Sequence, residues 1–261
     1  MEIIGNKVPV CKYCGKEYVE NLNIPANFPD FIKQAMKYIP ACDCEEKQEK
    51  KRRELEEKER QKQCLMNKVK RYRDISVIDK KFLQSTFENS NMSDKHMGMS
   101  KKYADKFILD GTAQGGILFY GGVGTGKTYA SACICNQLMN NGKTVLVMNL
   151  GLYLLKIMRE WAEAENDVLN YVKTCDLLVI DDLGTENISD FTREKMFNLI
   201  DTRYRANKPM IITTNLTPME IKEKLGSRIA DRLAGSCLEY EVKGESKRKF
   251  DKKAFAEWLT A

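Results

Sequence analysis

The stretch YGGVGTGKT at residues 120–128 has the composition and spacing of a loop that binds phosphate groups. It fits the pattern G-x-x-x-x-G-K-[ST], with Gly121, Gly126, Lys127 and Thr128 at the fixed positions. Glycines let the backbone adopt positive φ and turn its N–H groups toward phosphate oxygens, and the following helix adds its positive end. Lys127 is expected to reach the β- and γ-phosphates of a nucleotide, and Thr128 to ligate Mg²⁺. The residues predicted to contact the nucleotide are Gly121, Gly122, Val123, Gly124, Thr125, Gly126, Lys127, Thr128 and Tyr129.

Acidic and amide side chains follow two other apolar runs. In LLVIDDLG the apolar run leads into Asp181 and Asp182, and Glu186 comes a few residues later. In parallel sheets the carboxyl ends of the strands face the ligand. Asp181 is expected to hold Mg²⁺ through water and Asp182 to orient or deprotonate the attacking water, with Glu186 as a second candidate for that role. Asn215, which ends the run IITTN, could touch the γ-phosphate or the water, so the set predicts nucleotide hydrolysis.

Two arginines lie one helical turn apart in GSRIADRL, at Arg228 and Arg232. Residues four apart share a helix face, so two cations there repel each other unless an anion faces them. The anion could be a surface carboxylate such as Asp231, or a ligand bound by a neighbouring chain. The residues alone leave this choice open.

Four cysteines near the beginning of the chain have the spacing of metal ligands. CKYC and CDC supply Cys11, Cys14, Cys42 and Cys44. C-x₂-C followed by a second close pair indicates a structural zinc site with four thiolates. An iron–sulfur cluster and free thiols are the alternatives. His96, the single histidine, has no partner histidine and is expected to be an exposed residue without a role.

The apolar runs predict the elements that position these residues. Continuous runs separated by helical stretches indicate parallel strands covered on both faces, which is an α/β fold. The predicted strands lie within 116–120, 144–150, 177–180 and 210–216. A helix is predicted over 129–140, because its apolar residues share one face and Gly142 follows it.

The composition divides the chain into three predicted regions. Residues 1–44 form a cysteine-rich module too poor in apolar residues to build a core. Residues 45–75 read as a charged helical linker, since 45–73 holds twelve Lys and Arg and seven Asp and Glu. Its acid-before-base pairs include Glu49–Arg53 and Glu56–Arg60. Residues 76–261 contain the predicted sheet and all the phosphate-directed motifs.

Bulk properties exclude some classes of protein. The 261 residues are 43% hydrophobic and 31% charged, with a net charge of +6. No apolar run approaches the roughly 18 residues that a membrane span needs, and the first residues lack the apolar core of a signal peptide. We therefore expect a cytoplasmic protein with no membrane partner, in which clustered cysteines favour metal over disulfides.

In their order along the chain, GGVGTGKT, LLVIDDLG, IITTNL, SRIADRL and GESKR resemble the motifs of the AAA+ ATPases. Within these, the chain is similar to the DnaC-type helicase loaders and to the IstB-type transposition helpers. The resemblance implies an αβα sandwich, ATP as the nucleotide and Asn215 in the sensor-1 position. It also implies an arginine finger acting on a neighbouring subunit's γ-phosphate, for which Arg232 is preferred over Arg228. Arg248 matches the nucleotide-contacting arginine of the last motif.

The cysteine-rich beginning joined to such an ATPase resembles the DnaI sort of loader. That resemblance implies that residues 1–44 dock on a hexameric replicative helicase, and that the ATPase domain binds single-stranded DNA and self-associates through its ATP site. The segment 152–161, with Lys156 and Arg159 beside Tyr153 and Trp161, is a candidate DNA contact. The alternatives are a transposition helper that assembles on duplex DNA and a zinc-bearing adaptor that uses nucleotide only as a switch.

Overall fold

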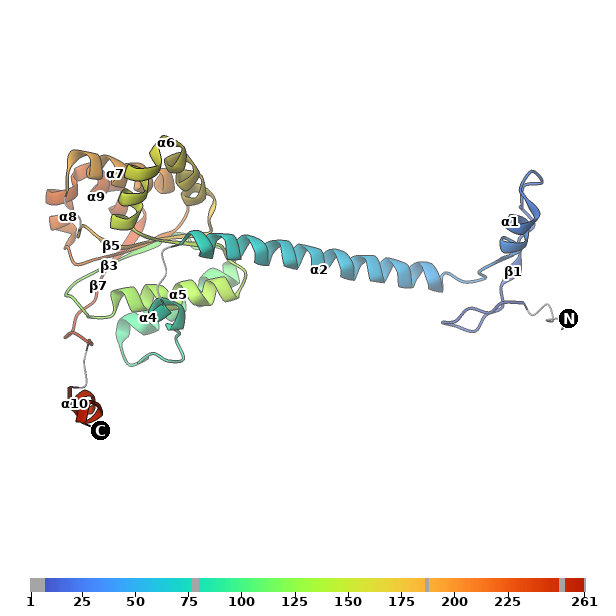
Figure 1. The fold of residues 1–261 in the computed structure, drawn as a ribbon, viewed down its shortest axis with the longest axis horizontal. Helices are drawn as coiled ribbons and strands as arrows, with labels where there is room; N and C mark the ends of the chain where they lie inside the picture. The colour runs from blue at the N-terminus through green and yellow to red at the C-terminus, as the bar shows by residue number, and fades with distance from the viewer. Residues whose placement is uncertain (1–7, 77–79, 186–187, 249–251, 261) are drawn as a thin grey trace. The chain divides into compact units, whose positions relative to one another are not determined.

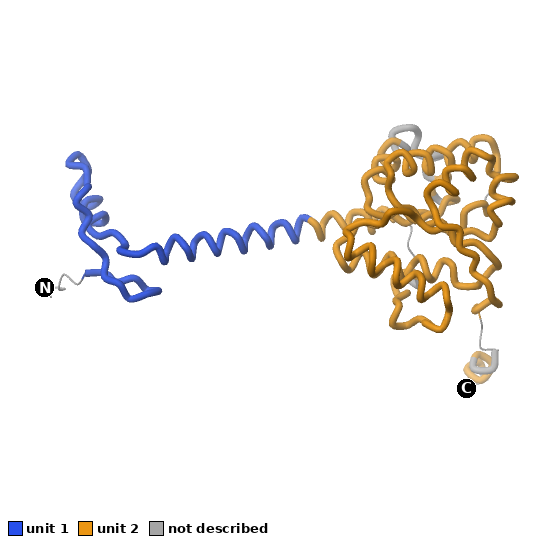
Figure 2. The backbone as a smooth tube through the Cα atoms, turned by 180° about the vertical axis from the view of Figure 1, so that it is seen from behind, with its two compact units in different colours: residues 1–64 blue, residues 65–261 orange. Residues whose placement is uncertain are grey.

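The computed structural model describes residues 8–76, 80–185, 188–248 and 252–260. The chain divides into two compact units, residues 1–64 and 65–261 (Figure 2). The division lies inside the segment 45–75 that the composition marks as a linker. None of the helices in the described ranges has the length and hydropathy needed to cross a membrane.

The first unit has almost no hydrophobic core. It contains strands β1 (Val19–Glu20) and β2 (Tyr38–Ile39), which pair antiparallel, and the short helix α1 (Asp30–Ala35) between them. Among described residues 8–64, only Cys11 is buried. A unit of this size without buried apolar side chains needs another source of stability, such as a metal ion.

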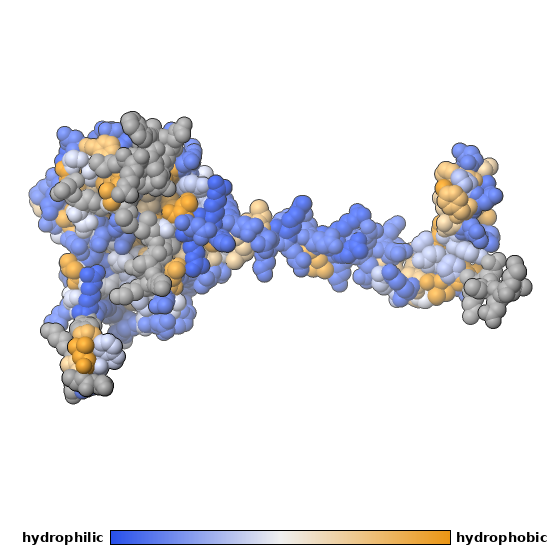
Figure 3. Space-filling view, in the orientation of Figure 1, coloured by the Kyte–Doolittle hydropathy of each residue, from blue (hydrophilic) through white to orange (hydrophobic). Residues whose placement is uncertain are grey.

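Helix α2 (Cys44–Ile75) begins in the first unit and ends in the second. Its surface is almost entirely hydrophilic along the first part (Figure 3). Of the two predicted ion pairs named above, Glu49–Arg53 is present with Nη2 and Oε1 2.6 Å apart, but Arg60 pairs with Glu57 instead of Glu56. Because these side chains are mostly exposed, each pair adds only about 0.3–0.5 kcal/mol of helix stability.

The last turns of α2 belong to the second unit. Val69 and Tyr72 are buried there, and the Ser76 hydroxyl accepts a hydrogen bond of 2.9 Å from the Val147 amide. Val147 lies on an edge strand, so this contact satisfies one backbone donor that the edge would otherwise leave open.

The second unit is built on a five-stranded parallel sheet with the order β4-β5-β6-β3-β7. Its strands are β3 (Gly116–Tyr120), β4 (Val145–Asn149), β5 (Leu177–Leu183), β6 (Met210–Thr214) and β7 (Cys237–Glu241). The first four confirm the strands predicted from the apolar runs. The sequence analysis missed β7, an edge strand whose side chains are half-buried or exposed.

Helices cover both faces of this sheet (Figure 1). One face carries α3 (Lys80–Gln84), α4 (Lys95–Asp110) and α5 (Lys127–Asn140). The other carries α6 (Leu150–Thr174), α7 (Asp190–Arg205), α8 (Pro218–Leu225) and α9 (Ser227–Ala234). Alternate residues of β3 point to the two resulting cores, since Ile117 and Phe119 pack in one and Leu118 in the other. A final helix, α10 (Lys252–Thr260), has exposed Phe255 and Trp258 side chains.

A buried arginine ties together the amino-terminal ends of two central strands. Arg203, on α7, is completely buried. Its guanidinium donates hydrogen bonds to the carbonyl oxygens of Val172, Cys175, Asp176 and Pro209. Asp176 directly precedes β5 and Pro209 directly precedes β6, so one side chain holds both strand starts. Buried cations require full hydrogen bonding of this kind.

Candidate functional site

The predicted phosphate loop joins β3 to α5 in the conformation that its glycines were expected to permit. Gly121, Gly124 and Gly126 have φ values of 130°, 76° and 104°. A Cβ atom on Gly121 would lie 2.6 Å from the Val242 carbonyl oxygen, so a side chain there would also clash. Because α5 begins at Lys127, the loop lies against the positive end of a 14-residue helix.

Lys127 is held by three oxygen atoms at the centre of this loop. Its Nζ donates to the carbonyl oxygens of Gly121 and Gly122 at 2.8 and 2.7 Å and to Asn215 Oδ1 at 2.8 Å. Burial lowers the pKa of Lys127, while the charge of Asp182 acts in the opposite direction. The contact with Asn215 brings the ends of β3 and β6 together, as the sequence predicted for parallel strands.

Asp181 forms a second centre beside the loop. Its Oδ1 accepts hydrogen bonds from the Thr128 hydroxyl at 2.9 Å and from the Thr213 hydroxyl at 2.6 Å. A threonine hydroxyl and a carboxylate are hard oxygen ligands of the kind that Mg²⁺ prefers. The predicted magnesium pair, Thr128 and Asp181, therefore lies together and has suitable donor chemistry.

Asp182 lies in an irregular part of β5. The register between β5 and β6 shifts between Ile180 and Leu183, and Asp182 has a φ of 59°. Asp tolerates this left-handed conformation better than most residues, and bulges often re-aim side chains near active sites. No described residue forms a hydrogen bond with the Asp182 carboxylate. Glu186, the second candidate for positioning water, lies outside the described residues.

A cavity of about 1050 Å³ opens over the loop and these carboxylates. One wall comes from the segment before β3, which the sequence analysis did not assign to the site. Asn136 of α5 fixes this segment by donating to the carbonyl oxygens of Phe82 and Ser85, both at 2.8 Å, and the Tyr129 hydroxyl donates to Thr86. The lining residues of this wall are Phe82, Ser85, Asn89, Ser90, Asn91, Asp94, His96 and Met97.

The expectation for His96 was wrong. Its side chain is 6% exposed, and its Nε2 lies 3.2 Å from the position that a Cβ atom on Gly126 would occupy. Burial and then the charge of Lys247 lower the pKa of His96, while Asp94 acts to raise it. No described residue hydrogen-bonds to the buried Nε2 atom. The histidine therefore packs against the phosphate loop as an integral part of the cavity wall.

The segment after β7 lies across the other side of the loop. The Lys247 amide donates to the Gly124 carbonyl at 2.9 Å, and a Cβ atom on Gly124 would collide with Ser246. Lys247 and the predicted nucleotide contact Arg248 both line the cavity. The charge of Arg248 also contributes to the lowered pKa of Lys127.

The two arginines of α9 have different surroundings. Arg232 donates from Nε to Asp201 Oδ1 at 2.5 Å, and its side chain is 21% exposed. Arg228 is exposed, and its guanidinium lies 4.3 Å from the centre of the Phe197 ring, with no ion pair to a described carboxylate. The anion facing Arg232 thus belongs to the same chain, whereas the charge of Arg228 remains available at the surface.

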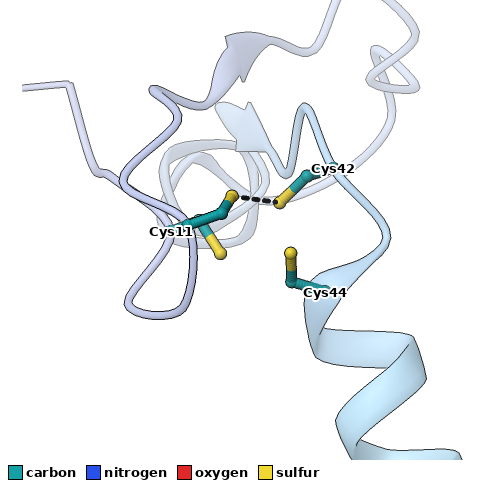
Figure 4. Close-up of side chains that lie close together, drawn as sticks. Cys11, Cys42 and Cys44 are labelled. Carbon is teal, nitrogen blue, oxygen red and sulfur yellow. Dashed lines mark hydrogen bonds between the residues drawn. The ribbon is translucent and has the colours of Figure 1, made fainter.

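The four predicted zinc ligands lie together in the first unit, and Figure 4 shows the side chains of Cys11, Cys42 and Cys44 close to one another. All four Sγ atoms lie within 4.8 Å of one another, and those of Cys14 and Cys42 are 3.5 Å apart. Thiolates bound to one zinc ion at 2.3 Å stand about 3.8 Å apart in a tetrahedron, so the cluster fits this metal. Hydrogen bonds from the backbone of Tyr13 and Cys14 lower the pKa of Cys11 to about 7, whereas hydrogen bonds with the Cys14 and Cys42 side chains raise the pKa of Cys44 to about 12.

The structure describes the side chains of only some residues of the candidate DNA contact in α6. Tyr153 is 4% exposed and packs in the core, so it cannot stack on a nucleic-acid base as that interpretation required. The side chains of Lys156, Arg159 and Trp161 lie outside the described residues.

Comparison with known proteins identifies the family. A family model described as IstB-like ATP binding protein matches residues 34–254. The chain belongs to the IstB-like family. Together with the fold, this confirms the resemblance to the DnaC- and IstB-type AAA+ proteins.

The chain is also similar to proteins named as replicative helicase loaders. Replicative helicase loader DnaC of Escherichia coli (strain K12) is 30% identical over 140 residues, which cover 52% of this chain and 56% of that protein. The chain thus spans about half the length of the DnaC relatives that it matches in this way. Replicative helicase loader DnaI of Bacillus subtilis (strain 168) is 24% identical over 260 residues, covering 91% of this chain and 78% of that protein.

Solved structures show the same fold. A crystal structure of DnaI has a TM-score of 0.57 at 21% identity and covers 68% of this chain and 100% of its own. The crystal structure of the DnaC helicase loader has a TM-score of 0.55 at 21% identity and covers 63% of this chain and 100% of its own. The predicted α/β AAA+ fold is therefore confirmed, while the roles of the individual site residues stay predictions.

Proposed function

We propose that this IstB-like protein hydrolyses ATP at a site that a second copy of the chain completes. The observation that carries the proposal is the convergence of Lys127, Asp181 and Asn215 from three different strands and loops upon one cavity. Lys127 would bind the β- and γ-phosphates, and the N–H groups of the loop would bind the remaining phosphate oxygens. Mg²⁺, when bound through Thr128 and Asp181, would neutralise charge on the β- and γ-phosphates.

Asp182 is the residue that we assign to the attacking water. Its carboxylate forms no hydrogen bond with a described residue and lies close enough to Lys127 to affect its pKa. A carboxylate so placed can orient the water or accept its proton. The Asn215 side chain, whose Oδ1 is engaged by Lys127, retains its N–H donors for the γ-phosphate or the same water.

The trans-acting arginine is assigned to Arg228. An arginine finger must be free to reach the nucleotide of the next subunit, and Arg232 is held by Asp201 within its own chain. Arg228 is exposed on the same helix face, its guanidinium lies over the Phe197 ring, and it forms no ion pair with a described carboxylate. This reverses the preference drawn from the sequence motif, and it leaves Arg232 with the role of anchoring α9 to α7.

For the whole chain we propose the role of a replicative helicase loader. The similarity to Bacillus subtilis DnaI extends over 91% of this chain, so it includes at least part of the cysteine-rich unit as well as the ATPase domain. That unit would dock on the hexameric helicase in the cytoplasm, and the ATPase domain would bind single-stranded DNA and self-associate around ATP. Exposed apolar side chains in the first unit, such as Leu22 at 88% and Phe31 at 74% exposure, suit a protein-docking role.

Co-purification with candidate replicative helicases tests this role. The full-length chain should retain a helicase, and Cys42→Ser should lose it because the unit can no longer hold zinc. Cys64→Ser is the matched control, since Cys64 is exposed on α2 and lies outside the cysteine cluster. Equal retention by both variants, or by neither, would contradict docking through the zinc unit.

A transposition helper is the second candidate, because the matching family description refers to IstB. That function predicts ATP hydrolysis stimulated by duplex DNA and no helicase bound to the wild-type chain. A nucleotide-switched adaptor makes a third prediction, namely that Lys127→Ala leaves every activity of the protein intact. Measuring both helicase retention and ATP hydrolysis with single-stranded and duplex DNA, for the wild-type chain and Lys127→Ala, separates the three.

A further inference from the structure

An ion pair joins two walls of the nucleotide cavity that lie far apart in the sequence. Lys247 Nζ donates to Asp94 Oδ2, although 153 positions separate the two residues. Both residues line the cavity, and their side chains are 48% and 27% exposed. A pair with this much exposure is weak, so a stronger anion can replace Asp94 as the partner of Lys247.

Lys247 is fixed beside the phosphate loop by its backbone. Its amide donates to the Gly124 carbonyl, and its Nζ lies 3.8 Å from the position that a Cβ atom on Gly126 would occupy. The loop and the start of α5 attract phosphate groups at this place. A flexible lysine side chain anchored here can reach a phosphate by rotamer changes alone, without movement of the backbone.

Asp94 has an alternative use for its carboxylate. It occupies the N-cap position of α4, where an aspartate side chain ordinarily accepts a hydrogen bond from the backbone of the first turn. Here it makes no such bond and contacts Lys247 instead. The Met97 amide already donates to the Asp94 carbonyl, so the His96 amide is the donor that a rotated carboxylate would meet. Asp94 could therefore release Lys247 and still accept a hydrogen bond, from the His96 amide.

We propose that Asp94 and the phosphates of the bound nucleotide compete for Lys247, which makes Lys247 a phosphate ligand in addition to Lys127 and Arg248. When Lys247 moves to the phosphates, Asp94 caps α4. This couples the wall formed by residues 94–97 to the presence of nucleotide. The inference rests on the proposed function, because it requires the cavity to bind ATP.

A double-mutant cycle in equilibrium binding tests the competition. Fluorescent mant-ATP and mant-ADP are titrated with the full-length wild-type chain, Asp94→Asn, Lys247→Met and the double variant. Asp94→Asn should bind nucleotide roughly two- to fivefold more tightly, because Asn still caps the helix but no longer holds Lys247. Lys247→Met should bind about tenfold more weakly, since it loses one charge-assisted phosphate contact. In the Lys247→Met background, Asp94→Asn should have little further effect.

The controls separate this inference from the proposed function. Lys243→Met removes an exposed lysine of the same segment, which pairs with Glu241, and should bind as the wild type does. Lys247→Arg should restore most of the affinity. Unchanged or weaker binding by Asp94→Asn, or equal effects of Asp94→Asn in both backgrounds, would overturn the competition while leaving ATP binding intact. A folded wild-type chain that binds neither nucleotide would instead contradict the proposed function and the inference with it.

Hydrogen exchange provides a readout of the capping step. Adding ATP should slow exchange of the His96 amide in the wild-type chain, because the Asp94 carboxylate then accepts its hydrogen bond. In Lys247→Met the carboxylate is free before nucleotide binds, so the same amide should already be protected. Slowing by ATP to the same extent in both chains would contradict the link between the two events.

Discussion

Truncating Arg232 and truncating Arg228, both on α9, should harm the protein in two different ways. Arg232→Ala removes the 2.5 Å hydrogen bond to Asp201 and the contacts of the guanidinium with the Phe197 and Tyr204 rings, 5.0 and 5.6 Å from their centres. Arg228→Ala removes only the contact with the Phe197 ring. The first change therefore affects the fold, and the second leaves it nearly intact while removing the proposed trans-acting charge.

The magnitudes follow from these contacts. A hydrogen bond between charged groups contributes about 1.5–3 kcal/mol, and a cation–π contact at an exposed site about 0.5–1 kcal/mol. Because Arg205 remains paired with Asp201 after Arg232 is truncated, we expect Arg232→Ala to lower the free energy of unfolding by about 2–3 kcal/mol. Arg228→Ala should lower it by only about 0.5–1 kcal/mol. Loss of an arginine finger lowers kcat by about 10³–10⁵, or about 4–7 kcal/mol of activation free energy.

Urea unfolding and steady-state ATP hydrolysis measure the two effects separately. Hydrolysis is followed as a function of chain concentration, and Arg228→Ala is mixed with Lys127→Ala, because a shared site predicts that the mixture regains part of the lost activity. Arg205→Ala is the matched control, since its side chain is 74% exposed and shares the same aspartate. Full turnover by Arg228→Ala, together with inactive but stable Arg232→Ala, would refute the assignment.

The Asp201 carboxylate adds a pH test to the same comparison. Desolvation alone would raise the pKa of Asp201, but the hydrogen bonds from Arg232 and Arg205 lower it below its ordinary value of 3.8. A lowered pKa contributes stability that is present above the ordinary value and is lost as pH falls through the lowered one. The difference in unfolding free energy between the wild type and Arg232→Ala should therefore shrink below pH 3.8.

Three further outcomes are expected. Arg203→Met should lower the free energy of unfolding by about 3–5 kcal/mol in urea titrations, because several buried carbonyl groups lose their donor; a loss under 1 kcal/mol would contradict that account. Metal analysis should find about one zinc ion per chain, much less in Cys42→Ser, and a wild-type amount in Cys64→Ser; a metal-free wild-type chain would exclude the zinc site. His96→Gln should flatten the decline in stability below pH 6.5, because an imidazole whose pKa is lowered from 6.5 in the fold is protonated first in the unfolded chain. An unchanged pH profile of unfolding would show that His96 does not cause the decline.

Local patterns in the sequence predicted the central sheet and the groups that converge on the phosphate loop. The apolar runs gave four of the five strands, because strands buried on both faces must be apolar throughout. The sequence analysis did not predict strand β7 (sequence CLEYE). This strand lies at the sheet edge and leaves Leu238 and both of its glutamates exposed, so it forms no continuous apolar run. Lys127, Asp181 and Asn215 could be placed because Lys127 and Asn215 follow their strands and Asp181 lies near the end of its own, and parallel strands end at one edge.

The features that the sequence analysis missed depend on contacts between distant segments. His96 packs against Gly126, which lies 30 positions later in the sequence, and nothing near the histidine indicates that neighbour. The partner of Arg232 is Asp201, 31 positions earlier and on another helix, so the motif alone could not show which arginine is free. On α2, Arg60 had acceptors three and four residues away, and the choice between them depends on side-chain rotamers.

Arg203 secures β5 and β6 at the ends where those strands begin, whereas the nucleotide-directed side chains gather where they finish. The two functions are thus spatially insulated from each other along the same pair of strands. A genetic screen for inactive alleles should recover substitutions of Arg203. The proteins that these alleles encode keep all the catalytic groups unchanged. Such alleles should be temperature-sensitive and recover when grown cold, while alleles at Lys127 should stay inactive at every permissive temperature.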